Sequence, residues 1–239
     1  MPGKKKSTTK RAASARSAQK AVAQARSSHR RGGLLFGAGA VVVVALLVVV
    51  IVVATSSGSR QPGSASPNLT SPAAITAVGR DIAPPWPAPA DATAAVRAAG
   101  LPMLDQEGAV EHIHAHLDVR VDGQPVEVPA FLGIDQTRGS ISPVHTHDAT
   151  GVIHIESPVT RQFSLGEFFS EWAVSLSADN LGALRATGGN TVRVYVNGTP
   201  RTGNPAAVMI NAHDEITLIY GQPQPHESVP ASYKFPQGE

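Results

Sequence analysis

The chain has 239 residues, no cysteine and a formal net charge of +2 at pH 7. The lack of cysteine excludes disulfides, thiolate metal sites and cysteine nucleophiles, so a bound metal would need imidazole, carboxylate or backbone ligands. All 18 acidic residues lie beyond residue 54, whereas half of the 20 basic residues lie within the first 32. Because the basic charge is concentrated in one end segment, we expect that segment to meet anionic lipid and expect no nucleic-acid partner.

Residues 34–54 are predicted to form a transmembrane helix, because they contain no charged or polar side chain. At about 1.5 Å per residue, such a helix spans about 30 Å, the thickness of a bilayer core. The positive-inside rule places the basic tail, residues 1–33, in the cytoplasm and the remainder outside. A cleaved signal peptide is the alternative, although its apolar region is usually about 7–15 residues long. We therefore predict a single-pass protein of the cell membrane that contacts lipid through residues 34–54.

Residues 55–90 are rich in serine, proline, glycine and alanine and are predicted to form a semi-extended linker. Residues 91–239 then form an extracytoplasmic domain of ordinary size. The domain is expected to begin with a short helix over 91–100, in which Asp91 is the N-cap and Gly100 follows the last turn.

Strands dominate the rest of the prediction. Apolar and polar residues alternate over 114–121, and the following Asp122-Gly123 pair is typical of a two-residue hairpin turn. Further strands are expected over 125–132, 150–156, 191–196 (followed by an Asn197-Gly198 turn), 206–210 and 215–220.

A second helix is expected over 164–172, where Ser164 and Glu167 have the spacing of a capping box. Its apolar face at helical spacing comprises Leu165, Phe168, Phe169 and Trp172. The order of elements resembles a β-grasp arrangement, so the predicted class is α+β: a small mixed β-sheet with one packed helix, preceded by the transmembrane helix. A small β-barrel or sandwich is the alternative, because only one strong helix is expected.

Histidines give the clearest functional pattern. His112, His114 and His116 are spaced by two residues, so they would project from one face of a strand, about 7 Å apart. A solvent-facing stripe is the simpler interpretation. However, a second pair, His145 and His147, follows with an acidic neighbour. Separate segments that each carry such a pair can meet in a sheet and bind one ion.

We therefore predict a metal site. The expected ligands are His114, His116, His145 and His147, followed by His112 and His154; Asp148 and Glu156 are either ligands or acceptors that orient an imidazole. Imidazole and carboxylate ligands suit copper and zinc about equally. His213, in a turn, and His226, in a proline-rich segment, are expected to be structural or surface residues.

Three runs of the sequence carry a resemblance to a protein family: residues 112–123 (HIHAHLDVRVDG), 142–157 (SPVHTHDATGVIHIES) and 163–172 (FSLGEFFSEW). With the closing segment 220–236, they resemble an exported, histidine-rich family of high-GC Gram-positive bacteria and some archaea. The resemblance covers about residues 98–238 and implies no particular activity.

Three functions fit these patterns. The first is binding of copper or zinc near the cell surface, for storage, delivery or sensing beside a membrane-protein partner. The second is a metalloenzyme with an open coordination position, and the third is an assembly protein whose histidines are structural. A cupin is disfavoured because the spacing between His147 and the next glutamate is wrong. The hydrolase motifs His-Glu-x-x-His and Gly-x-Ser-x-Gly are also missing from the sequence.

Overall fold

The computed structural model describes residues 68–225 and 227–237. Within this part of the chain, no helix combines the length and apolar character needed to cross a membrane. The predicted cytoplasmic tail and the predicted transmembrane helix, residues 1–33 and 34–54, lie outside the described residues.

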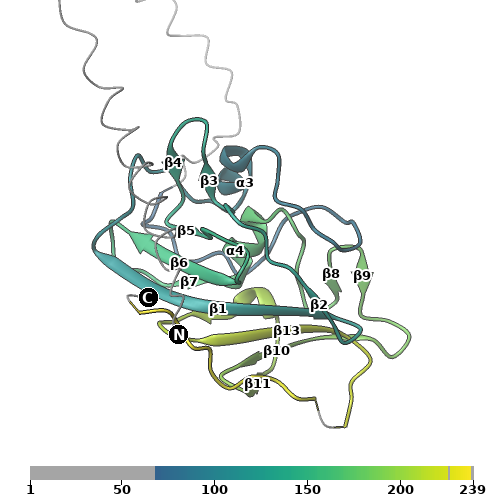
Figure 1. Ribbon diagram of the computed structural model, residues 1–239. Coiled ribbons are helices and arrows are strands. Elements are labelled where there is room, and N and C mark those ends of the chain that lie inside the picture. The colour runs from purple at the N-terminus through teal and green to yellow at the C-terminus, as the bar shows by residue number, and fades with distance from the viewer. Residues whose placement is uncertain (1–67, 226, 238–239) are drawn as a thin grey trace, which may run out of the picture. The chain divides into compact units, whose positions relative to one another are not determined.

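A seven-stranded mixed sheet organises the domain (Figure 1). Its strands run in the order β11–β10–β13–β1–β6–β5, and β2 pairs with one end of β1. The central strands β1 and β13 are parallel, whereas the other pairs in this sheet are antiparallel. The bounds are β1 (Glu111–Val121), β2 (Gln124–Val126), β5 (Val144–His145), β6 (Val152–Ser157), β10 (Thr191–Val196), β11 (Thr199–Arg201) and β13 (Glu215–Gly221).

Two α-helices and three small two-stranded sheets complete the described fold, which is therefore an α+β domain dominated by a mixed sheet. Helix α3 packs against α4, and α4 packs against the 3-10 helix η1. The bounds are α3 (Ala92–Ala98), α4 (Leu165–Glu171), η1 (Pro205–Ala207), β3 (Ile134–Asp135), β4 (Ser140–Ile141), β7 (Phe163–Ser164), β8 (Asn180–Leu181), β9 (Leu184–Arg185) and β12 (Met209–Ile210).

Local signals in the sequence produce the expected caps and turns. Asp91 accepts a hydrogen bond from the N–H of Ala94, and Ser164 and Glu167 form both bonds of the capping box. Asp122 has φ 51° and Gly123 has φ 80°, which is the pattern of a type I′ hairpin turn. The predicted caps and the β1–β2 turn are therefore confirmed.

Two predicted strands are shorter than expected. The strand expected over 125–132 is limited to β2, and Pro129, which follows it, has no N–H to donate to a strand ladder. The strand expected over 206–210 begins instead as the 3-10 helix η1, which has Pro205 in its first turn, and only Met209–Ile210 form β12.

The core lies between one face of the sheet and α4. The apolar face of α4 predicted from the sequence is completely buried, and Trp172 at its end has no exposed surface. The same hydrophobic core contains Ala115 and Leu117 of β1 and Ile153 and Ile155 of β6. Because side chains alternate between the faces of a strand, the histidines of β1 lie on the opposite face.

The predicted linker extends to residue 90, but its described part, from residue 68, packs against the domain. Trp86 is only 1% exposed, and its ring meets Trp172 edge to face with centroids 5.9 Å apart. The indole N–H of Trp172 donates to the carbonyl of Trp86 at 2.8 Å. This segment therefore contributes to the core in addition to connecting it to residues before 68.

Candidate metal centre

Strand pairing brings three histidines into one row across β1, β6 and β5. His114 is opposite His154, and His154 is in turn opposite His145. Directly opposed residues point to the same face of a sheet. The ring centroids of His114 and His154 are 4.6 Å apart, and those of His145 and His154 are 5.4 Å apart. The three imidazoles therefore converge on the face opposite the core.

His147 and Glu156 complete a group of four potential ligands. His145 Nε2 is 3.2 Å from His147 Nε2, and His154 Nδ1 is 3.5 Å from Glu156 Oε1. Two ligands bound tetrahedrally at about 2.1 Å lie about 3.4 Å apart, so both spacings match neighbouring ligands of one ion. One ligand atom from each of the four side chains lies within 4.8 Å of the others. The group could therefore hold a metal ion.

The His145 ring is oriented for this role. Its Nδ1 is 2.9 Å from the carbonyl oxygen of Ser142, which can only accept, so Nδ1 carries the proton and donates. Nε2 of the neutral ring then presents its lone pair toward His147. Burial, with the neighbouring His147, lowers the pKa of His145 to about 3, so the ring is neutral at physiological pH. Such a bond to the far ring nitrogen is the usual support of a metal-binding imidazole.

Helix α4 holds Ser142 in turn. The Ser142 hydroxyl donates to Glu171 Oε1, and it accepts a hydrogen bond from the N–H of Val144. Glu171 is fully buried, and this burial raises its pKa well above the ordinary value, which favours the protonated carboxyl. The position of His145 therefore depends on a residue of the helix on the core side.

Two members of the group, His154 and Glu156, are buried and each has a polar atom without a hydrogen-bond partner among the described residues. His154 and Glu156 are 8% and 4% exposed, and neither His154 Nδ1 nor Glu156 Oε2 has a hydrogen-bond partner within the described residues. A buried polar group left unpaired costs about 1–3 kcal/mol. A metal ion bound between the two side chains would satisfy both atoms.

The protonation states of His154 and Glu156 are compatible with binding a cation. Burial, followed by the neighbouring His147 and His114, lowers the pKa of His154 to about 4, so this imidazole is also neutral. Burial, together with the nearby carboxylate of Glu107, raises the pKa of Glu156 to about 7. A bound dication would stabilise the ionised form of Glu156 and so lower its pKa again.

One side of the group is open to solvent. The His147 side chain is 42% exposed, and its Nε2 lies 3.8 Å from Glu107 Oε1. Both residues line a pocket of about 440 Å³ whose other walls include Phe131 and Ile141. An ion could therefore enter past His147 without unfolding of the sheet.

A second group of potential ligands adjoins the first and shares Glu156 with it. It comprises His112, His114 and Glu156, and His112 Nε2 lies 3.4 Å from Glu156 Oε1. His112 is opposite Glu156 in the β1–β6 register. Burial and the nearby His112 lower the pKa of His114, so its ring also favours the neutral form.

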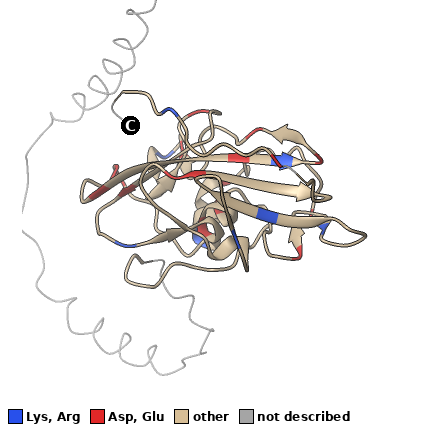
Figure 2. Cartoon of the chain, turned by 90° about the horizontal axis from the view of Figure 1, so that it is seen from below, with Lys and Arg blue, Asp and Glu red and all other residues tan. Residues whose placement is uncertain are grey.

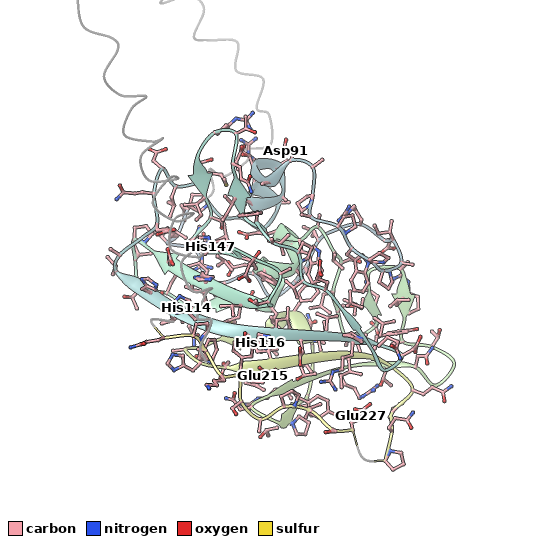
Figure 3. The ribbon with its side chains drawn as sticks, in the orientation of Figure 1. Asp91, His114, His116, His147, Glu215 and Glu227 are labelled. Carbon is pink, nitrogen blue, oxygen red and sulfur yellow. The ribbon has the colours of Figure 1, made fainter. Side chains whose placement is uncertain are left out.

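His116 does not join either group. Its Nδ1 is 2.7 Å from Glu215 Oε2 of β13, and its Nε2 is 2.9 Å from the carbonyl oxygen of Thr150. Figure 3 shows His114 and His147 over one end of the sheet and His116 farther along β1, beside Glu215. Tyr233 stacks on the His116 ring at a centroid distance of 3.8 Å. With both nitrogens engaged, His116 anchors β13 and the C-terminal segment.

This anchor makes stability depend on pH. Burial alone would lower the pKa of His116, but the hydrogen bond and charge of Glu215 outweigh burial and raise it. The stabilisation is therefore complete below the ordinary histidine pKa of about 6.5 and is lost as pH rises through the higher folded-state value.

We expect His116→Gln to lower the free energy of unfolding by about 1.5–3 kcal/mol at pH 6, as expected for loss of a charged hydrogen bond. The difference from wild type should shrink as pH rises above about 6.5. The difference in the free energy of unfolding is measured by urea unfolding at a series of pH values, with both proteins made metal-free. A difference that is the same at pH 6 and pH 9 would contradict this role.

Asp148, a predicted ligand or acceptor, and His213, predicted to be a structural or surface residue, belong to neither group. Asp148 Oδ1 accepts from the N–H of Thr150 at 2.9 Å and from the hydroxyl of the same residue, so it stabilises the loop before β6. His213 is exposed in a turn with φ 60°, and its ring lies 5.1 Å from that of Phe235. The N–H of His213 donates to the carbonyl of His114.

Three residues near the site were not expected from the sequence. Glu107 precedes β1 in an irregular segment, Ser142 acts partly through its backbone carbonyl, and Tyr233 lies in a proline-rich segment. None of them has a periodic spacing or a motif that would have indicated its position.

In comparisons with known proteins, no family model, no curated protein and no solved structure matches this chain.

Proposed function

We propose that this protein binds a divalent copper or zinc ion through His145, His147, His154 and Glu156. The observation that carries the proposal is the convergence of these four side chains, two of which are buried and have an atom without a hydrogen-bond partner among the described residues. Three imidazoles and one carboxylate form a ligand set that suits zinc or copper(II), and no thiolate competes because the chain has no cysteine.

The proposed role is metal handling outside the cytoplasm, near the cell surface. It rests on the predicted membrane helix, residues 34–54, and on the resemblance of residues 98–238 to an exported histidine-rich family. Partly exposed His147 supports a site that exchanges its ion with solvent or with a membrane-protein partner. Within the described residues, Lys and Arg are scattered among acidic residues (Figure 2). A β-grasp-like fold belongs to the same proposal and is supported by the parallel central pair β1 and β13.

A metalloenzyme is the second candidate, and the pocket beside His147 favours it. If His145, His147 and His154 alone held the ion, one position would stay open for a water that the metal would activate at neutral pH, and Glu107, 3.8 Å from His147, could act as its base. Hydrolysis of chromogenic ester and phosphoester substrates by the metal-bound protein, abolished in Glu107→Gln with metal content unchanged, would favour the enzyme over the carrier.

The metal content of the full-length chain tests the proposal. The chain is purified in detergent without a histidine tag, stripped with a chelator and titrated with zinc and with copper in competition with a chromophoric chelator. We expect at least one ion bound with a dissociation constant below micromolar. If neither metal binds more tightly than micromolar, the histidines are packing residues and the proposal is wrong.

A further inference from the structure

The two groups of potential ligands contain more donors than one ion requires. Zinc in proteins is almost always four-coordinate, and His145, His147, His154 and Glu156 already provide four ligands. His112 and His114 then remain, and they form their own group with Glu156. Glu156 is the only residue that the two groups share.

The carboxylate of Glu156 is placed to serve both groups. Its Oε1 is 3.4 Å from His112 Nε2 and 3.5 Å from His154 Nδ1, one residue from each group. Its Oε2 is buried and has no hydrogen-bond partner among the described residues. A carboxylate that is shared by two groups of ligands can bridge two metal ions, which lie about 3.5–4 Å apart in two-metal sites.

We propose that the centre binds two divalent ions bridged by Glu156, with the second ion bound by His112 and His114. This proposal rests on the proposed function, because it requires the first ion at His145, His147 and His154. Glu107 supplies a second carboxylate near His147, which adds negative charge beside the two ions.

The two positions differ in exposure, which predicts different strengths. His145 and His154 are buried, whereas the side chain of His112 is 55% exposed. The second ion has three protein ligands, so water completes its coordination. We therefore expect the inner ion to be held tightly and the outer ion to exchange readily with solvent.

Cobalt(II) is the probe for the test, because its visible spectrum and paramagnetism report coordination and ion–ion contact. The full-length chain in detergent is titrated with Co²⁺, and bound cobalt is counted after desalting. Wild type is expected to bind two ions in two steps, and the cobalt EPR signal per ion should fall when the second ion binds. His112→Ala is expected to bind one ion, with its affinity within about 3-fold of the first wild-type step.

Two further variants keep the result interpretable. His213→Asn removes an exposed histidine outside both groups, and asparagine tolerates the positive φ of that position; it should still bind two ions. Glu156→Gln should bind at most one ion, more weakly, and should show no coupling between ions.

The outcomes separate the two proposals. One ion in wild type, or two ions in His112→Ala, overturns the bridged pair and leaves the single-ion function intact. No tight ion in wild type overturns both proposals. Two ions without any change in the EPR signal per ion show separate sites and overturn the bridge.

Discussion

The double substitution His145→Ala/His154→Ala is expected to lower the affinity for the most tightly bound zinc ion at least about 100-fold. Loss of a residue that only supports a ligand commonly costs 10–100-fold in metal affinity, and this variant removes two ligands. Only His147 and Glu156 of the first group remain. Competition with a chromophoric zinc chelator, using the full-length chain in detergent, measures the change.

His147→Ala provides a milder test, because the side chain is 42% exposed and its removal leaves the core untouched. We expect at least about a 10-fold loss of zinc affinity with an unchanged circular dichroism spectrum. His213→Asn is the matched control and should bind zinc as wild type does. Wild-type affinity in both ligand variants would mean that the ion binds elsewhere.

Zinc should also raise the melting temperature of wild type and not that of the double variant, since a ligand that binds only the folded state stabilises it. This readout does not depend on a colorimetric competitor. An equal rise in both proteins would contradict a site formed by these residues.

Trp86→Ala is expected to lower the free energy of unfolding by about 3–5 kcal/mol, the usual cost of removing a buried aromatic side chain. Trp86 is 1% exposed and packs edge to face on Trp172, and its indole N–H donates to the carbonyl of Ile82 at 2.8 Å. Urea unfolding followed by far-ultraviolet circular dichroism measures the change without depending on tryptophan fluorescence.

Ile75→Ala is the matched control for this segment. Ile75 is 54% exposed, so its truncation should change the free energy of unfolding by less than about 0.5 kcal/mol. If Trp86→Ala were equally mild, residues 68–90 would contribute no stability and would act only as a linker.

The sequence by itself determined the local elements of this domain. Alternating residues in β1, the Asp122-Gly123 turn and the capping box of α4 each depend on neighbours within a few positions. The same local rule placed His112 and His114 on one face of β1, because successive side chains of a strand point to opposite faces. The apolar face of α4 followed from helical spacing in the same way.

Only the tertiary structure decided which histidines lie together. His114 and His116 are equivalent by spacing, yet His114 is opposite His154 of β6, whereas His116 meets Glu215, 99 residues away, across the parallel β1–β13 pair. Which strands pair, and in which register, depends on the burial of the whole sheet and does not follow from the residue spacing within one strand. Spacing along the chain therefore could not separate a potential ligand from an anchor, and it could not locate Glu107, whose position depends on how an irregular segment packs.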